Sequence, residues 1–377
     1  MLTRAGRVWM SAMLLALAAC TSSAPVAEPP LWHGEVTLTI GADSGGATTM
    51  FGGISGLAFA PAGRILVSDP RDHLVRVFSG QGAVVYSLGR PGRGPGDLGG
   101  PCCLAVRGDT LWVRERDNYR YSAFLLGDTA ATFVRTMDVG TNGVWNDDRV
   151  DFDSAHRLID LQSAFDPRSA AFRIVRQFRE VPGAVVREDT MPSPPPDSLD
   201  LLSFSRAGGI TTYYPEFGAR ELHAYGAGGQ SAHAVSSRYA VEWRDASGRR
   251  VALLEQPITR GPPLTPDERA RSDSFLVQTA REAGRAPTTF GVETPTHRPP
   301  VEALGFDLEG RLWVQHAVAR QARRVADVYS AGRWIARATW PAGVHLTGHA
   351  IRDSTGLGVA VGEDGTERVV LLRWRTP

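Results

Sequence analysis

The stretch GRILVSDPRDHLVRVFSGQGAVVYSLG, residues 63–89, contains three short apolar segments separated by turn residues. Val, Ile, Leu, Tyr and Phe fill the segments, and Gly, Pro, Asp and Ser lie between them, which is typical of antiparallel strands joined by tight turns. A further apolar segment, GLAFAP (56–61), comes directly before them. We therefore expect residues 56–89 to form four successive strands of one sheet.

The same order of strands recurs along the chain. Segments that match the second strand are GRILVSD (63–69), DTLWVRE (109–115), HRLIDLQ (156–162) and GRLWVQH (310–316). The first three begin about 46 residues apart, which is within the range of propeller blades. Two more units of this kind fit residues 221–257 and 345–374.

The last unit supplies only three strands, and an isolated strand, EVTLTI (35–40), precedes the first unit. Pairing of this strand with the end of the chain completes a ring and removes the exposed sheet edges that favour aggregation. The sequence thus predicts an all-β fold, a six-bladed β-propeller over residues 35–377 whose N-terminal strand closes the last blade. Two stacked β-sandwiches are the alternative.

One segment departs from the strand pattern. Thr265 and Glu268 form a capping box, Pro266 occupies the first helical turn, and Gly284 is placed to end a helix. We expect a helical insertion at about 265–284. The Pro-rich segment MPSPPPDSLD (191–200) is expected to be a loop without a core of its own.

The repeat also resembles a known family. The order F-x-x-x-G-R-I-L-V-S-D-x-x-D-H-L-V-R-V-F, followed by G-R-x-G-x-G-P-G-D-L, resembles the NHL-type and TolB-like six-bladed propellers, and in particular a group of bacterial lipoproteins with this fold. The resemblance implies the fold and says little about activity, because one fold hosts many functions.

The N-terminus has the pattern of a targeting segment: a charged start, a short apolar run and the sequence LAAC (17–20), which resembles a bacterial lipobox. This resemblance implies a signal peptide at 1–19, a lipid anchor on Cys20 and a tether at 20–34. The residue after Cys20 is Thr21, not Asp, which in proteobacterial lipoproteins favours the outer membrane. We expect the protein in the bacterial cell envelope, on the periplasmic face of the outer membrane or the cell surface. An ordinary signal peptide is the alternative.

Two cysteines remain, Cys102 and Cys103, and they are adjacent. In an oxidising compartment they form either a vicinal disulfide or two buried thiols, and the sequence favours neither. A metal site on these two residues is not expected, because they lack the usual C-x-x-C spacing.

Composition and motifs exclude some functions. The formal net charge is +1, which argues against a broad electrostatic grip on nucleic acid. A G-x-G-x-x-G pattern occurs at Gly94, Gly96 and Gly99, but strand-like segments follow it, and a dinucleotide cradle requires a helix there. No G-x-S-x-G motif occurs at a strand-to-helix turn.

The polar residues fall mainly on the loops that propellers present on one face. The candidates for a ligand face, which combine charges with aromatic rings, are Arg71, Asp72, Arg116, Asp117, Tyr119 and Trp145. They suit a protein, peptide or glycan partner. The first hypothesis is therefore a lipid-anchored, monomeric, non-catalytic binding or scaffold module without a cofactor, and solvated surface residues are the simpler interpretation of each side chain.

The second hypothesis is enzymatic. The propellers that the chain resembles include metal-dependent lactonases and an amidating lyase, whose ligands converge on the central channel. In the expected channel-lining positions most residues are apolar or small, and Asp151, His223 and His349 are the exceptions. These three could bind one divalent metal ion in a hydrolase or lyase, although an isolated inner-strand His is more often a hydrogen-bonded core residue. Bound metal distinguishes the two hypotheses.

Overall fold

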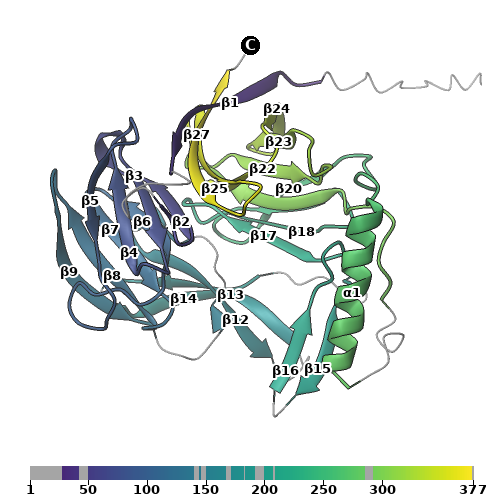
Figure 1. Cartoon of the computed structure of the whole chain (residues 1–377), viewed down its shortest axis with the longest axis horizontal. Helices are drawn as coiled ribbons and strands as arrows, with labels where there is room; N and C mark the ends of the chain where they lie inside the picture. Colours follow the sequence, from purple (N-terminus) through teal and green to yellow (C-terminus); the bar gives the residue numbers. More distant parts are fainter. Residues whose placement is uncertain are drawn as a thin grey trace, which may run out of the picture.

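The computed structural model describes residues 28–41, 50–139, 144–145, 150–166, 171–181, 183–191, 199–206, 209–284 and 292–375. Within these residues the chain is all-β apart from one α-helix and one short 3-10 turn, η1 (Pro61–Gly63). The sheets follow one another in chain order around the molecule, in a propeller-like arrangement (Figure 1).

Three sheets each contain four antiparallel strands in sequential order. The first sheet consists of β2 (Gly56–Phe59), β3 (Ile65–Asp69), β4 (Leu74–Phe78) and β5 (Val84–Leu88). The second sheet consists of β6 (Pro101–Arg107), β7 (Thr110–Glu115), β8 (Arg120–Leu126) and β9 (Ala131–Asp138). The fourth sheet consists of β17 (Glu221–Tyr225), β18 (Ser231–Val235), β19 (Ala240–Arg244) and β20 (Arg250–Glu255). The strands predicted from residues 56–89 are confirmed.

The third sheet has five strands, and a separate hairpin follows it. The sheet consists of β10 (Val144–Trp145), β11 (Asp151–Phe152), β12 (Leu158–Asp166), β13 (Ala171–Arg179) and β14 (Val185–Thr190). The hairpin consists of β15 (Leu202–Arg206) and β16 (Gly209–Tyr213). The sequence did not predict this hairpin. It lies just beyond the Pro-rich segment that was expected to be a loop, of which residues 192–198 lie outside the description.

The remaining strands form one eight-stranded sheet, called the fused sheet here. Its first half consists of β21 (Val301–Phe306), β22 (Leu312–His316), β23 (Arg324–Ser330) and β24 (Arg333–Trp340). Its second half consists of β1 (Leu31–Ile40), β27 (Glu367–Arg375), β26 (Thr355–Val361) and β25 (Val344–Arg352). β1 joins the halves because it contacts both β24 and β27.

The predicted pairing of the chain ends is confirmed, with one extension. β1 runs antiparallel to β27, so that Val36 lies opposite Leu372 and Ile40 opposite Val369. The strand begins at Leu31, however, not at residue 35, and residues 31–33 pair in parallel with β24. This extra pairing turns part of the expected tether into strand. It also explains why six separate four-stranded sheets are not seen.

The sheets pack face to face, with an apolar cluster between neighbours. Val75 and Leu104 belong to the cluster between the first and second sheets. Trp243 and Phe306 belong to the cluster between the fourth sheet and the fused sheet. The first strands also contact one another in chain order, as in β2 with β6, β6 with β11, β17 with β21, and β21 with β25. This arrangement buries both faces of each sheet, as in a propeller.

A carboxylate at the end of the second strand recurs in the first two sheets. Asp69, fully buried, accepts hydrogen bonds from Arg76 Nη1 at 2.7 Å and from the Gly52 backbone amide at 2.8 Å. Glu115, also fully buried, accepts from Arg120 Nε at 2.8 Å and from the Gly99 amide at 3.0 Å. In both sheets the acid ties the loop before the first strand to an arginine of the third strand.

The glycine-rich loop at residues 89–100 connects β5 to β6 and is followed by a strand, as predicted. Gly92 and Gly96 adopt φ angles of +153° and +80°, a region that disfavours other residues. Arg120 donates to the carbonyl oxygens of Arg93 and Asp97 in this loop, at 2.8 and 3.1 Å. The glycines therefore serve the passage between two sheets and not a phosphate site.

The predicted helical insertion is α1 (Pro266–Glu282), and its capping box between Thr265 and Glu268 is present. It packs on the end of the β15–β16 hairpin, where the rings of Phe275 and Tyr213 lie 6.0 Å apart at 82°. Within the described part of the chain, the helical content is too short and too polar to cross a bilayer.

Two predictions concern cysteines: the lipid anchor on Cys20 and the redox state of Cys102 and Cys103. The signal peptide and Cys20 lie outside the described residues, as does the tether up to residue 27. Cys102 and Cys103 lie at the start of β6, where the pairing with β7 is irregular, and the structure holds them as two buried thiols.

Candidate metal centre

The three residues that the sequence grouped as metal ligands lie on three different strands. His223 lies at the middle of β17, the first strand of the fourth sheet. Asp151 is the first residue of β11 in the third sheet, and its Oδ1 accepts a hydrogen bond from the Phe152 amide. His349 lies in β25, and its side chain is outside the description. Asp151 is not among the residues that gather around His223.

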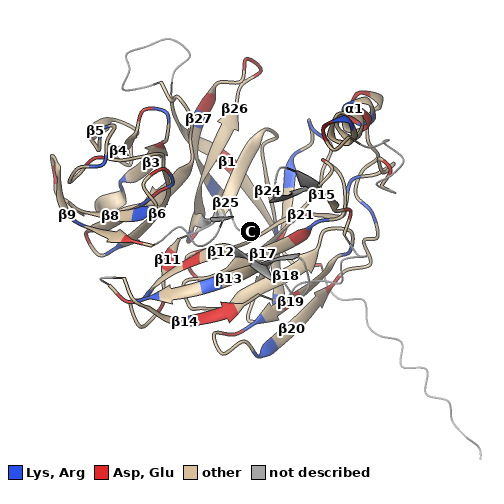
Figure 2. Ribbon diagram, turned by 90° about the horizontal axis from the view of Figure 1, so that it is seen from below, with Lys and Arg blue, Asp and Glu red and all other residues tan. Residues whose placement is uncertain are grey.

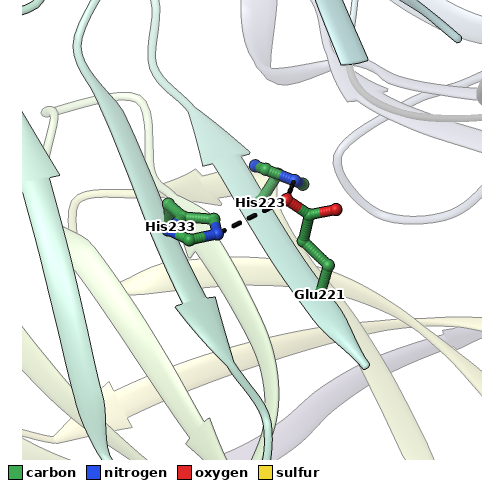
Figure 3. A group of neighbouring side chains, drawn as sticks. All are labelled: Glu221, His223 and His233. Atoms are coloured by element: carbon green, nitrogen blue, oxygen red, sulfur yellow. Dashed lines mark ion pairs between the residues drawn. The ribbon is translucent and has the colours of Figure 1, made fainter. Parts of the chain in front are cut away.

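His223 is joined instead by Glu221 and His233, and the three are the ligand cluster of this article (Figure 3). The Nε2 atom of His223 lies 2.9 Å from Glu221 Oε1, and the Nε2 atom of His233 lies 3.4 Å from the same oxygen. The two imidazole rings have centroids 5.0 Å apart and are inclined at 35°. One ligand atom from each residue lies within 4.8 Å of the other two.

The sequence produces this cluster through strand geometry. Residues two apart on a strand point to the same face, so Glu221 and His223 share a face of β17. The turn at residues 226–230 places β18 antiparallel to β17, and in this register His223 lies directly opposite His233. Opposed side chains on one face have Cβ atoms about 5 Å apart, which brings the imidazoles together.

The ligand cluster faces the third sheet. Tyr225, on the same face of β17, packs with Ile159 and Phe178 of the third sheet. Leu222, on the opposite face, belongs to the apolar cluster shared with the fused sheet. The apolar cluster between the third and fourth sheets contains four buried residues, fewer than the other clusters between described residues. The polar group thus occupies an interface that has little apolar packing of its own.

The ligand cluster is largely buried but reaches solvent. The side chains of His223, Glu221 and His233 are 6%, 14% and 15% exposed. Among the described residues, neither ring nitrogen of His223 nor Nε2 of His233 has a hydrogen-bond partner of good geometry, although both Nε2 atoms are close to the carboxylate. Buried polar atoms are normally hydrogen-bonded, so these nitrogens call for an explanation.

The carboxylate is ionised under all ordinary conditions. Burial by itself raises the pKa of Glu221, but the adjacent imidazoles of His223 and His233 outweigh burial and lower that pKa to about 2. An ionised carboxylate and two imidazoles are the ligand types that zinc prefers, and a His₂Glu set is typical of catalytic zinc sites.

Zinc binds imidazole nitrogen and carboxylate oxygen at about 2.0–2.2 Å, so ligand atoms of a tetrahedral site lie about 3.3–3.6 Å from one another. The separation of 3.4 Å between His233 Nε2 and Glu221 Oε1 falls in this range, and the separation of 2.9 Å between His223 Nε2 and the same oxygen is shorter. Three protein ligands would leave one tetrahedral position of a zinc ion for water or substrate, and the side chains of Glu221 and His233 keep partial contact with solvent.

The predicted ligand-face residues of the first two sheets lie beside one loop. Arg71 and Asp72 occupy the turn after β3, where the Asp72 carboxylate pairs with Arg76. Arg116 and Asp117 follow β7, and their amides donate to carbonyl oxygens of Gly100 and Gly99.

Tyr119, in the same turn, is 46% exposed and has a φ angle of +53°. Trp145 lies in β10 opposite Gln162, with its side chain outside the description. Nothing in the structure shows what these residues bind, and the ligand face stays a prediction.

A second polar group lies where the fourth sheet meets the fused sheet. Asp327, fully buried, accepts hydrogen bonds from Tyr239 Oη at 2.7 Å and Arg337 Nε at 2.9 Å, and His316 Nε2 lies 2.9 Å away. Burial would raise the pKa of Asp327, but these three donors outweigh it and lower the pKa. The carboxylate has its full set of partners, which indicates a structural role.

No family model matches the chain, and no curated protein matches its sequence. Several solved structures align with most of its length. A putative exported protein from Bacteroides fragilis is 10% identical, with a TM-score of 0.49, and the alignment covers 91% of this chain and 95% of that one.

For virginiamycin B lyase from Staphylococcus aureus the values are 12% identity, a TM-score of 0.42, and coverage of 85% and 94%. For glutaminyl cyclase from Myxococcus xanthus they are 14%, 0.36, and coverage of 93% and 100%.

Sequence reasoning found His223 but missed Glu221 and His233. It compared equivalent positions of the expected inner strands, and this comparison does not include the neighbouring strand of the same hairpin. The signal was present, because Glu221-x-His223 is a same-face pair and the turn at 226–230 predicts the register that brings in His233.

Proposed function

We propose that this chain is a zinc-dependent hydrolase or lyase whose metal is held by Glu221, His223 and His233. The observation that carries the proposal is the ligand cluster itself: two imidazoles and an ionised carboxylate within 4.8 Å in a largely buried position, where His223 Nδ1 has no hydrogen-bond partner among the described residues. Bound zinc supplies Lewis acidity and a water whose pKa is near 7.

The residues of the chain supply the rest. Glu221 contributes the negative charge that offsets part of the charge of a divalent cation, and its low pKa keeps it in the ligating form. Tyr225 and the apolar side chains of the third sheet beside it exclude water from one side of the ligand cluster. Both features favour a bound cation over solvated side chains.

A second candidate function is the non-catalytic binding module. The exposed Tyr119 ring favours it, because Tyr119 lies in a turn that contacts the glycine-rich loop through the amides of Arg116 and Asp117. The two candidates are compatible in one molecule, but only the first makes zinc necessary.

We also propose a six-bladed propeller and an envelope location. Each half of the fused sheet contains four strands, β21–β24 in one and β25–β27 with β1 in the other, which supports counting it as two blades.

The LAAC sequence at 17–20 supports a lipid anchor on Cys20. Mass spectrometry of the mature N-terminus from bacterial membranes tests the anchor, and Cys20→Ala should release the protein into the soluble fraction.

Turnover of a panel of chromogenic esters, lactones and phosphoesters tests the enzymatic function. We expect the zinc-loaded protein to act on at least one class, and the activity to be lost on chelation and restored by zinc. His233→Ala should abolish it, because it removes a ligand.

His316→Gln is the matched control, because it changes a histidine beside another carboxylate and should leave the activity intact. Activity that survives chelation, or that His233→Ala leaves unchanged, overturns the proposal. Zinc binding without turnover favours the second candidate.

A further inference from the structure

An open cavity of about 280 Å³ lies beside the fourth sheet, and part of its lining is close in sequence to the ligand cluster. Five segments line it: the segment before β15, the segment before β17, the turn between β18 and β19, the chain after β20, and the segment before β21. Its lining includes Asp200, Ala219, Ser237, Arg260 and Arg298.

The cavity adjoins the proposed metal site. Ala219 lies two residues before Glu221, a span of about 7 Å on an extended chain. Ser237 follows Ser236, whose amide donates to the Arg220 carbonyl at 2.9 Å. The cavity therefore adjoins the start of β17 and the end of β18, the two strands that carry the ligands.

Its walls are rigid. The segments at 261–264 and 296–298 are tied by three backbone hydrogen bonds: Gly261 N to Arg298 O at 2.9 Å, Arg298 N to Pro262 O at 2.9 Å, and Leu264 N to Thr296 O at 3.0 Å. Pro295, Pro299 and Pro300 restrict the chain further. A cavity with such walls is formed before a ligand arrives, which lowers the entropic cost of binding.

The charged residues of the lining are two arginines and one aspartate. Arg298 is fixed by an ion pair with Glu268 and by stacking of its guanidinium over Phe217 at 5.0 Å, and its buried Nε has no hydrogen-bond partner among the described residues. Arg260, which is exposed, has no ion pair within the described part of the chain. Asp200 is the acid of the lining, and its carboxylate is engaged by the Ala219 amide at 2.6 Å.

From this arrangement we infer that the cavity binds an oxyanion group, a carboxylate or a phosphate, of the small molecule on which the metal site acts. The reaction of the bound molecule rests on the proposed function, but the binding of its anionic group does not. A guanidinium without a carboxylate partner is suited to bidentate recognition of either anion. The substrate would then place its reacting bond toward Glu221 and its negative group toward Arg260.

Calorimetric titration of the metal-free protein with benzoate, inorganic phosphate and benzamide tests the inference. Without metal, anions have no zinc to bind, and benzamide matches benzoate in shape without its charge. We expect benzoate or phosphate to bind and benzamide not to bind. The tighter of the two anions identifies the oxyanion.

Two arginine variants locate the site. Arg260→Ala should weaken anion binding at least tenfold, whereas Arg269→Ala, which removes an exposed arginine of α1 outside the cavity, should not change it. Binding of benzamide as tight as that of benzoate overturns the inference. So does anion binding that Arg260→Ala leaves unchanged, or the absence of binding by both anions.

The failure of this inference differs from the failure of the proposed function. Zinc titration of Arg260→Ala should match that of the unmodified chain, and Glu221→Gln should still bind the anion. Loss of zinc binding alone contradicts the metal site and leaves the anion site standing. Loss of anion binding alone has the opposite meaning.

Discussion

The first two sheets and the fourth sheet each contain a carboxylate at the end of a strand, but its partners differ. Asp69 and Glu115 are fully buried and hold an arginine together with a backbone amide. In the fourth sheet Glu221 lies on the first strand, and its neighbours are His223 and His233. An arginine has only donors and neutralises the acid, whereas a neutral imidazole offers a lone pair.

This difference separates a structural ion pair from a site that accepts a cation. In the acid–arginine pairs the two charges neutralise each other, so no further ion is needed at those positions. The ligand cluster combines one negative charge with two imidazoles, and under the proposed function a bound cation completes it. Figure 2 shows acidic and basic residues interspersed over the sheets, so the distinction depends on local partners and not on a charged face.

The largest effect is expected from breaking an acid–arginine pair. Arg76→Met leaves Asp69 buried without its cation, and we expect the free energy of unfolding to fall by about 3–5 kcal/mol. Urea unfolding measures this change. A loss below about 1 kcal/mol would mean that the ion pair contributes little to stability. The proposed difference between the ion pairs and the ligand cluster would then not hold.

Acid titration should give the next largest effect. The pKa of Glu221 in the folded protein is about 2, below its usual value of 4.5, so the stabilising contribution is present above pH 4.5 and is lost as the pH falls toward 2. This shift corresponds to at most about 3 kcal/mol. The stability difference between the unmodified chain and Glu221→Gln should shrink over that pH range, and a constant difference would contradict the lowered pKa.

Zinc should stabilise the folded chain by binding to the fourth sheet and not to the first. At a free zinc concentration of 100 times Kd, binding to the folded state adds about 2.7 kcal/mol to the free energy of unfolding. We expect thermal unfolding to show this gain in the unmodified chain and in a variant with Asp72→Asn, and to show none in His223→Ala. Equal stabilisation of all three proteins would place the zinc elsewhere.

The smallest effect concerns how completely the carboxylates of the first two sheets are satisfied. Glu115 accepts a hydrogen bond from the fully buried Ser122 hydroxyl, in addition to those from Arg120 and Gly99. Ser122→Ala removes one donor of several, and we expect a loss of about 1 kcal/mol in urea unfolding. A loss as large as that of Arg76→Met would show that these acids are not saturated.

Much of the fold follows from local sequence. Residues 63–89 contain short apolar segments separated by turn residues, and Thr265 with Glu268 is a local capping signal, so both predictions hold in the structure. The extension of β1 to Leu31 depends on contact with β24, and the β15–β16 hairpin packs against α1. Neither contact is encoded in the segment itself, and neither was predicted.

The ligand cluster shows the same limit. His223 stands out in sequence because it is polar on an inner strand, but grouping it with Asp151 and His349 assumed that equivalent inner-strand positions converge on the channel. The structure brings His223 together with residues of its own hairpin, because the register of β17 and β18 decides the shortest distances.

Titration with Co²⁺, followed by its visible absorption, tests the metal site most directly, because the intensity and position of the bands report ligand type and coordination number. We predict one Co²⁺ per chain, displaced by zinc, with the spectrum lost in His233→Ala and Glu221→Gln and retained in Asp151→Asn. A spectrum that persists in His233→Ala, or that disappears in Asp151→Asn, would contradict the assignment of the site.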